Sequence, residues 1–347
     1  MAGSGTAHLR PADEVLLRVE NLVVDFPAGP GRRVSAVADV SLDVAEGETL
    51  GLVGESGCGK STTARAVIQL PKPTGGRVTF DGHDVTRLRG EALRRLRPQM
   101  QIVFQDPISS LNPRRRIADI VAAPLKVWGR GSDDERRARV DEVLEAVGID
   151  PTAARERRPH EFSGGQSQRI CIARSLVLDP ELIICDEPVS ALDVSVQAQI
   201  LNLLEDLKER FGLTLIFITH DLAVVKNVSD RIAVMYLGKV CEVAVPDRLY
   251  AAPAHPYTAA LLSSIPVPDP EAPAGTGELA AGDLPSPVSP PSGCRFRTRC
   301  PRAQERCAVE EPQTRQVADG QFVACHFPLV GEEAPPTPVE VTTAAAS

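Results

Sequence analysis

The chain contains few aromatic residues and no long hydrophobic run. Aromatic side chains make up 4 % of its 347 residues, and there is one tryptophan. No apolar stretch approaches the roughly 18–20 residues that a helix needs to span a bilayer. The first residues also lack the basic start and apolar centre of a secretory signal. We therefore expect a protein that stays in the cytosol and meets a membrane only peripherally, on its cytoplasmic face.

An excess of basic residues is also missing. The chain has 38 Lys and Arg against 46 Asp and Glu, which gives a formal net charge of −8. Proteins that bind nucleic acid carry a basic face that neutralises phosphates. The overall charge therefore argues against nucleic acid as a partner, although it leaves room for a local basic patch.

Alternating strand and helix patterns predict an α/β fold over residues 15–264. Short runs rich in β-branched residues are typical of strands covered on both faces. They occupy residues 16–26, 78–81, 101–104, 182–185, 213–218 and 231–236. Helical patterns occupy residues 61–70 and 196–211. Residues 107–178 interrupt the alternation with mostly helical sequence, and we interpret them as an inserted helical subdomain.

The remaining segments differ in composition. Residues 265–292 contain eight prolines and are predicted to be a linker. Residues 293–329 hold four of the eight cysteines and are predicted to form a small C-terminal Cys-rich module. Residues 1–14 and 330–347 are predicted to be disordered.

The clearest motif is a phosphate loop. Residues 54–61 read Gly-Glu-Ser-Gly-Cys-Gly-Lys-Ser and match G-x-x-x-x-G-K-[ST] between a predicted strand and a predicted helix. In such loops backbone N–H groups and the helix N-terminus bind phosphates, the lysine reaches the β- and γ-phosphates, and the hydroxyl binds Mg²⁺. The predicted nucleotide-binding residues here are Gly54, Glu55, Ser56, Gly57, Cys58, Gly59, Lys60, Ser61 and Thr62.

Two adjacent carboxylates end the apolar run at residues 182–185. Asp186 is predicted to bind Mg²⁺, and Glu187 to accept a proton from the attacking water or to orient it. Both would lie at the carboxyl edge of the sheet, beside the phosphate loop. Together the two motifs predict hydrolysis of a nucleoside triphosphate.

Further motifs resemble those of ABC-type ATPases. Residues 162–169, Phe-Ser-Gly-Gly-Gln-Ser-Gln-Arg, are similar to the signature motif of that family, with Phe162 in place of the usual leucine. Gln105 matches the Q-loop glutamine, His220 the switch histidine, and Phe26 the aromatic residue that stacks on adenine. The matching signature residues are Ser163, Gly164, Gly165 and Gln166, and the matching D-loop residues are Ser190, Ala191, Leu192 and Asp193.

This resemblance implies a P-loop NTPase fold and a mechanism that needs two subunits. The signature residues of one subunit would bind the ATP held on the phosphate loop of the other. ATP binding would close the dimer, and hydrolysis would let it open. The resemblance also implies that Glu187, His220 and Gln105 are catalytic. It implies that Ser61, Gln105 and Asp186 hold Mg²⁺.

Four other strings resemble the oligopeptide and dipeptide permease family, which includes nickel importers. They are residues 105–114, 254–262, 293–301 and 324–326. The resemblance implies an import complex with two membrane permease subunits, a second ATPase subunit that is identical or a sister, and indirectly a substrate-binding protein. The transported solute stays open among dipeptides, oligopeptides, nickel chelates and glycosides.

The tail cysteines have the spacing C-x5-C-x6-C-x17-C, at Cys294, Cys300, Cys307 and Cys325. Structural zinc sites usually pair their ligands as C-x2–4-C, which is missing here. Four thiolates in a small cytosolic segment still suggest a metal. Some members of the permease family carry an iron–sulfur cluster at these cysteines, so the resemblance implies a 4Fe–4S cluster. Zinc and free thiols remain alternatives.

Other functions fit the sequence less well. ABC ATPases of translation or DNA repair commonly have two nucleotide units or a long coiled-coil insert, and neither pattern is found. A redox-sensing nucleic-acid switch would need a basic reading helix, which is also not found. A small-molecule kinase would have no use for the signature and D-loop motifs.

Overall fold

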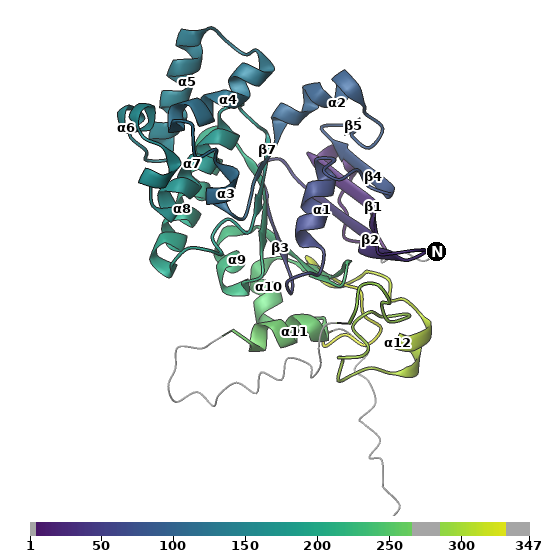
Figure 1. Ribbon diagram of the computed structural model, residues 1–347. Helices are drawn as coiled ribbons and strands as arrows, with labels where there is room; N and C mark the ends of the chain where they lie inside the picture. Colours follow the sequence, from purple (N-terminus) through teal and green to yellow (C-terminus); the bar gives the residue numbers. More distant parts are fainter. Residues whose placement is uncertain (1–4, 266–284, 331–347) are drawn as a thin grey trace, which may run out of the picture.

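The computed structural model describes residues 5–265 and 285–330. A lobe of helices lies on one side of the molecule, an antiparallel sheet on the other, and a larger sheet runs between them (Figure 1). Within the described residues no helix is long and apolar enough to cross a bilayer.

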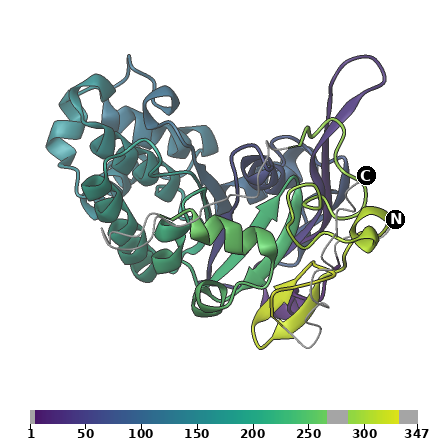
Figure 2. The same ribbon diagram turned by 90° about the horizontal axis from the view of Figure 1, so that it is seen from below.

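The smaller sheet has four antiparallel strands in the order β2-β1-β4-β5. Its strands are β1 (Leu17–Pro27), β2 (Arg33–Val44), β4 (Gly75–Phe80) and β5 (His83–Asp84). The long hairpin of β1 and β2 extends away from the rest of the molecule when it is seen from below (Figure 2).

The larger sheet has eight strands in the order β11-β12-β10-β9-β3-β8-β7-β6. They are β3 (Thr49–Val53), β6 (Met100–Val103), β7 (Leu182–Asp186), β8 (Thr214–Thr219), β9 (Arg231–Tyr236), β10 (Lys239–Ala244), β11 (Arg315–Ala318) and β12 (Gln321–Val323). The strands from β9 to β6 run parallel. Their carboxyl ends therefore meet at one edge, where ligands bind in sheets of this kind.

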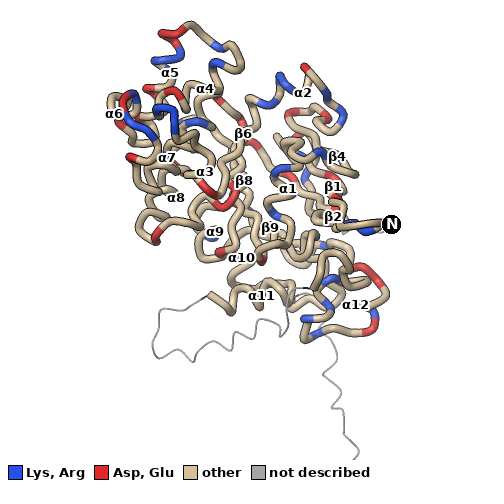
Figure 3. Tube along the Cα trace, in the orientation of Figure 1, with Lys and Arg blue, Asp and Glu red and all other residues tan. Residues whose placement is uncertain are grey.

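Helices flank both sheets. The helical lobe contains α3 (Pro107–Ser110), α4 (Ile117–Trp128), α5 (Asp133–Ala146), α6 (Pro151–Glu156) and α7 (Gly164–Leu176). The others are α1 (Lys60–Val67), α2 (Gly90–Leu96), α8 (Val194–Phe211), α9 (Leu222–Val228), α10 (Pro246–Ala251), α11 (Pro256–Ser263) and α12 (Glu305–Val309). Basic and acidic residues are interspersed over the helical lobe (Figure 3).

Two hydrophobic clusters hold these layers together. One joins the helical lobe to the larger sheet and includes Leu144, Ile172 and Leu215. The other fills the space between the two sheets around α1 and includes Leu17 and Ile216. Burial on both faces explains the apolar runs that make up β7 before Asp186 and β8 between Thr214 and Thr219.

The strands predicted from apolar runs are all present, as β1, β4, β6, β7, β8 and β9. Strands β2 and β10 were not predicted; they follow tight turns at Gly29–Arg32 and at Leu237–Gly238. The predicted helix at residues 61–70 ends earlier, at Val67, because Gln69 adopts a left-handed backbone conformation with φ of 61°.

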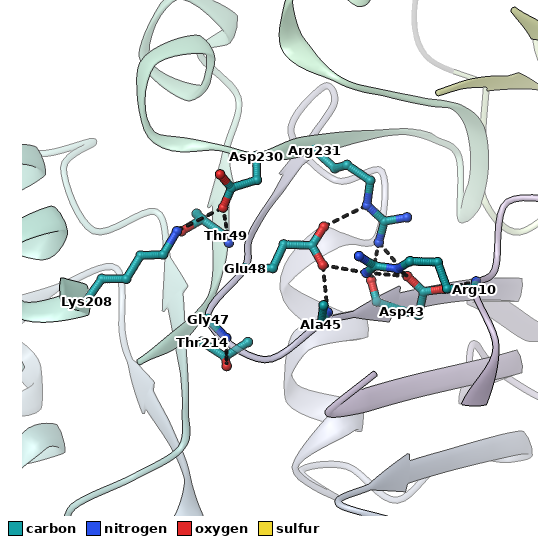
Figure 4. Close-up of polar contacts among 10 residues, drawn as sticks. All are labelled: Arg10, Asp43, Ala45, Gly47, Glu48, Thr49, Lys208, Thr214, Asp230 and Arg231. Atoms are coloured by element: carbon teal, nitrogen blue, oxygen red, sulfur yellow. Dashed lines mark hydrogen bonds and ion pairs between the residues drawn. The ribbon is translucent and has the colours of Figure 1, made fainter. Parts of the chain in front are cut away.

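The expected disorder of residues 1–14 differs from the structure, which describes residues 5–14 in defined contacts. The imidazole of His8 is buried, with Nε2 2.9 Å from the carbonyl oxygen of Ser41. Arg10 pairs with Asp43 and Glu48, and Arg231 contacts the same two carboxylates from β9 (Figure 4). A short segment with few apolar residues is thus held by buried charges rather than by hydrophobic contacts.

The Cys-rich segment does not stand apart as the expected module. Its strand β12 pairs with β10, so residues 315–323 extend the larger sheet. Phe296, 2 % exposed, packs against Tyr236 and Tyr257 of the core, with ring centroids 5.2 and 5.3 Å away. Most of the predicted linker, residues 266–284, and the predicted disordered end, residues 331–347, lie outside the described residues.

Candidate nucleotide site

The phosphate loop connects β3 to α1 and depends on glycine at two positions. Gly54 and Gly59 have φ of 154° and 107°. A Cβ atom at Gly59 would lie 2.3 Å from the carbonyl oxygen of Ala36, and one at Gly54 would lie 2.1 Å from that of Met235. Side chains there would therefore push the loop off the sheet. The backbone of the loop can follow this path only because both residues are glycine.

The lysine of the motif is held inside the loop. Lys60 is 4 % exposed, and its Nζ donates to the carbonyl oxygens of Gly54 and Glu55 at 2.7 and 3.0 Å. Lys60 is also the first residue of α1, where helix N–H groups and the helix dipole favour an anion. The loop therefore places a cation and free backbone donors together, as phosphate binding requires.

Ser61 and Asp186, two of the predicted Mg²⁺ ligands, lie in contact. The hydroxyl of Ser61 donates to Oδ1 of Asp186 at 2.6 Å, and Asp186 is fully buried at the end of β7. Arg65, which was not predicted, also reaches this site: its guanidinium lies 3.2 Å from Oδ2 of Asp186. Arg65 follows Ser61 by one helical turn and so lies on the same face of α1, a spacing that could have identified it.

The three predicted catalytic residues also converge. Nε2 of Gln105 donates to Oε2 of Glu187 at 3.0 Å, and Nδ1 of His220 lies 3.4 Å from the same oxygen. The three residues follow β6, β7 and β8, which are neighbours in the sheet. Glu187 itself has φ of 50°, an uncommon conformation for a non-glycine residue that is often found at functional sites.

The signature residues form the start of α7, in the helical lobe (Figure 1). Ser163 caps the helix: its hydroxyl accepts from the backbone N–H of Gln166 at 3.2 Å, and Oε1 of Gln166 accepts from the N–H of Ser163 at 2.9 Å. Ser163, Gly164 and Gln166 are exposed to solvent. The helix start is thus rigid, while its donors face outward.

The D-loop residues lie next to the signature within the same chain. Asp193 caps α8, and its carboxylate accepts from the N–H of Val196 at 3.0 Å. A Cβ atom on Gly165 would lie 2.5 Å from Cγ1 of Val196, so glycine allows α7 and α8 to meet closely. Ser190 donates to the carbonyl oxygen of Glu187 at 3.1 Å, and Ala191 and Leu192 complete the turn.

Phe26, predicted to stack on adenine, lies near the end of β1 and is 39 % exposed. An exposed ring on an exposed hairpin is compatible with stacking, but its role stays a prediction. Two residues far along the chain reach the phosphate loop and were missed: Tyr257 and Arg299 both contact Glu55. No local pattern could have identified contacts across such sequence distances.

The four tail cysteines are neighbours but do not form a defined metal site. Burial and then the adjacent thiols of Cys294, Cys300 and Cys307 raise the pKa of Cys325 to about 12. Among the residues that the structure describes, however, no group of three or more His, Cys, Asp or Glu side chains is placed to hold a metal ion. Two arginines next to these cysteines in the sequence have carboxylate partners: Arg299 pairs with Glu55, and Arg306 pairs with Glu310.

Comparisons with known proteins agree with this geometry. Residues 37–190 match the ABC transporter family, and residues 241–307 match the oligopeptide/dipeptide transporter C-terminal region. The oligopeptide transport ATP-binding protein OppF of Salmonella typhimurium is 51 % identical over 319 residues, which cover 89 % of this chain and 94 % of that protein. OppF of Escherichia coli is equally similar.

Solved structures give the same fold. The ATP-binding cassette MJ0796 bound to ADP and phosphate has 33 % sequence identity and a TM-score of 0.60, covering 66 % of this chain and 98 % of that one. A structure of cbiO1 from Clostridium perfringens has 31 % identity and a TM-score of 0.62, covering 69 % of this chain and 91 % of that one. The chain therefore belongs to the ABC transporter ATPases, with the C-terminal region of the oligopeptide and dipeptide transporters.

Proposed function

We propose that this protein is the ATP-hydrolysing subunit of an importer for dipeptides or oligopeptides. The observation that carries the proposal is the convergence of Gln105 and His220 on one carboxylate oxygen of Glu187, next to the Ser61–Asp186 contact. Similarity to peptide import ATPases over most of the chain supports the choice of solute.

In the proposed mechanism each residue has one task. Lys60 and the loop N–H groups bind the phosphates of ATP. Ser61, Asp186 and Gln105 would hold Mg²⁺, whose charge would offset the charge that develops on the γ-phosphate. Glu187 accepts a proton from the attacking water or orients that water, and His220 contacts the γ-phosphate and helps to hold the water.

The exposed start of α7 supports the two-subunit mechanism. Ser163 and Gly164 expose a hydroxyl and helix N–H groups that the described chain leaves facing solvent. We propose that these groups bind the γ-phosphate held by a second ATPase subunit, identical or a sister. ATP would then join the two subunits, and its hydrolysis would release them.

A groove on the helical lobe supports docking to two permease subunits at the cytoplasmic face of the membrane. It has a volume of about 430 Å³ and is lined by residues that include Asn112, Pro124 and Trp128. Ile108 and Val127 are exposed large apolar residues in the same lobe, at 70 % and 68 %. We propose that one permease subunit inserts a short cytoplasmic helix here, that the second permease subunit docks on the partner ATPase, and that the substrate-binding protein acts from the other side of the membrane.

The test is transport in a reconstituted complex. Co-expression with the permease pair, followed by vesicle reconstitution with ATP at the ATPase side, should give uptake of labelled peptides. The Glu187→Gln variant should abolish it. Uptake of nickel chelates or glycosides in place of peptides would favour a related importer, and ATP hydrolysis that never depends on permease subunits would favour a non-transport ATPase.

We also propose that Cys294, Cys300, Cys307 and Cys325 bind a 4Fe–4S cluster. The donor set and the proximity of the four thiols support it. Bound, such a cluster would cross-link the tail. Iron and acid-labile sulfide in protein purified without oxygen should fall in Cys300→Ser; stoichiometric zinc, or no metal, in the unsubstituted protein would contradict the cluster.

A further inference from the structure

We propose that Arg299, in the Cys-rich segment, is a positioning residue for the phosphate loop, which it holds through Glu55. The inference rests on the nucleotide-binding role of that loop proposed above. The C-terminal segment would then contribute a residue to the nucleotide site, although Arg299 and Glu55 are 244 positions apart in the sequence.

The first observation is an ion pair with little exposure to water. Nη1 of Arg299 lies 2.9 Å from Oε2 of Glu55, and the two side chains are 7 % and 21 % exposed, respectively. Oε1 of Glu55 is buried and has no hydrogen-bond partner within residues 5–265 and 285–330. Without Arg299 this carboxylate would lose its charge partner in a poorly solvated place, which is costly.

The second observation is that the backbone of Glu55 is held from the same side. The N–H of Glu55 donates to the hydroxyl of Tyr257 at 2.9 Å. Tyr257 is fully buried, and its ring packs against Tyr236 with centroids 4.7 Å apart. Both the side chain and the amide of one loop residue are therefore fixed by the C-terminal part of the protein.

Arg299 is itself well anchored. Its N–H donates to the carbonyl oxygen of Phe296 at 2.9 Å, and Phe296 is buried among the aromatic rings of Tyr236 and Tyr257. The guanidinium lies over the ring of Tyr236, 5.8 Å from its centroid.

The consequence concerns binding rather than the chemical step. Glu55 is the second residue of a glycine-rich loop, and Ser56 and Gly57, which follow it, are exposed. Ordering such a loop around a nucleotide costs conformational entropy. Fixing Glu55 beforehand reduces that cost, so loss of Arg299 should weaken MgATP binding while leaving the arrangement around Glu187 intact.

The experiment is a double-mutant cycle on the full chain, with MgATP binding followed by calorimetry and hydrolysis by steady-state kinetics. We expect Arg299→Ala to raise the Kd and KM for MgATP by about tenfold, as for loss of a hydrogen bond between charged groups. The kcat should change by less than about twofold, because the catalytic groups are untouched. Arg299→Lys should recover part of the affinity.

The matched control is Arg297→Ala, which removes a second arginine from the same turn. Arg297 donates to the carbonyl oxygen of Ser292 and not to the phosphate loop. The effects of Arg299→Ala and Glu55→Gln should not add in the double variant. Additive effects, a wild-type Kd in Arg299→Ala, or an equal loss in Arg297→Ala would each overturn the inference. A wild-type chain that binds no MgATP would instead refute the proposed nucleotide site.

Discussion

Nε2 of Gln105 and Oε2 of Glu187 lie 3.0 Å apart across neighbouring strand ends. His220 approaches the same oxygen from the strand on the other side of β7. The carboxylate is therefore oriented by both of its neighbours in the sheet, and its position does not depend on a flexible loop alone. This arrangement makes specific predictions about hydrolysis.

Replacing Glu187 by Gln should separate hydrolysis from binding. The amide cannot accept a proton from water, so we expect the hydrolysis rate to fall by about 100-fold or more while MgATP still binds. The bound ATP should then trap the two-subunit state, visible as a dimer in light scattering with the partner ATPase present. Glu205→Gln, on the exposed face of α8, is the control and should behave like the wild type.

Replacing Ser61 by Ala should weaken the binding of Mg²⁺ more than the binding of the nucleotide. The hydroxyl of Ser61 contacts Asp186, and we propose that both hold Mg²⁺. We expect the Mg²⁺ concentration for half-maximal hydrolysis to rise by about tenfold, since one ligand is lost. Ser61→Thr keeps the hydroxyl and should retain the wild-type Mg²⁺ dependence; a matching loss in both variants would contradict a ligand role.

Stability should fall in acid because of His255. Burial lowers the pKa of His255 to about 3. Its Nδ1 accepts from the N–H of Tyr257 at 3.0 Å. The unfolded chain takes up a proton below pH 6.5 and the folded chain does not. The free energy of unfolding should therefore decrease from pH 6.5 toward pH 3, by about 2 kcal/mol at pH 5.

Urea unfolding of His255→Asn tests this, because Asn keeps a helix-capping oxygen but does not titrate. Between pH 6.5 and 5 the free energy of unfolding should decrease much less in this variant than in the wild type. The control His83→Gln, at an exposed position, should show the same decrease as the wild type. The contact partner Glu242 acts with the opposite sign: burial raises its pKa, so its contribution to stability falls as the pH rises above 4.5. Comparison of each variant with the wild type at every pH separates the two groups.

Two ion pairs at one end of the larger sheet, Arg231–Asp43 and Lys208–Asp230, should contribute unequally to the free energy of unfolding (Figure 4). Arg231 pairs with Asp43 at 2.5 Å, where the carboxylate is fully buried. Arg231→Ala should therefore lower the free energy of unfolding by about 3 kcal/mol, because the buried carboxylates of Asp43 and Glu48 then lose one of the two arginines that they share. Lys208→Ala breaks an exposed pair with Asp230 and should cost less than about 1 kcal/mol. Equal costs in denaturant unfolding would contradict this ranking.

Much of the catalytic site could be predicted from sequence because its residues follow strands in a parallel sheet. Apolar runs located β6, β7 and β8, and the carboxyl ends of parallel strands must meet at one edge. The strand-end pattern therefore located Glu187, and the resemblance to ABC-type ATPases identified Gln105 and His220 at the ends of the neighbouring strands. The predicted roles of these residues still await experiment.

The parts that could not be predicted depend on contacts between distant segments. Arg299 and Tyr257 reach Glu55 across 244 and 202 positions, and nothing near them in sequence marks a partner. Strands β11 and β12 are short and only partly apolar, so their pattern is too weak to identify without the edge of β10 beside them. The Cys-rich segment was therefore predicted as separate when it completes the sheet.

The pairing of β12 with β10 has a consequence for synthesis of the protein. On the side of β10 that faces away from β9, Glu242, Val243 and Ala244 pair with Gln321–Val323, about 80 positions later in the chain. Until the ribosome has released that stretch, one flank of the nascent sheet presents unpaired amides and carbonyls. Chains truncated before residue 321 would keep this flank open and should associate with one another through it.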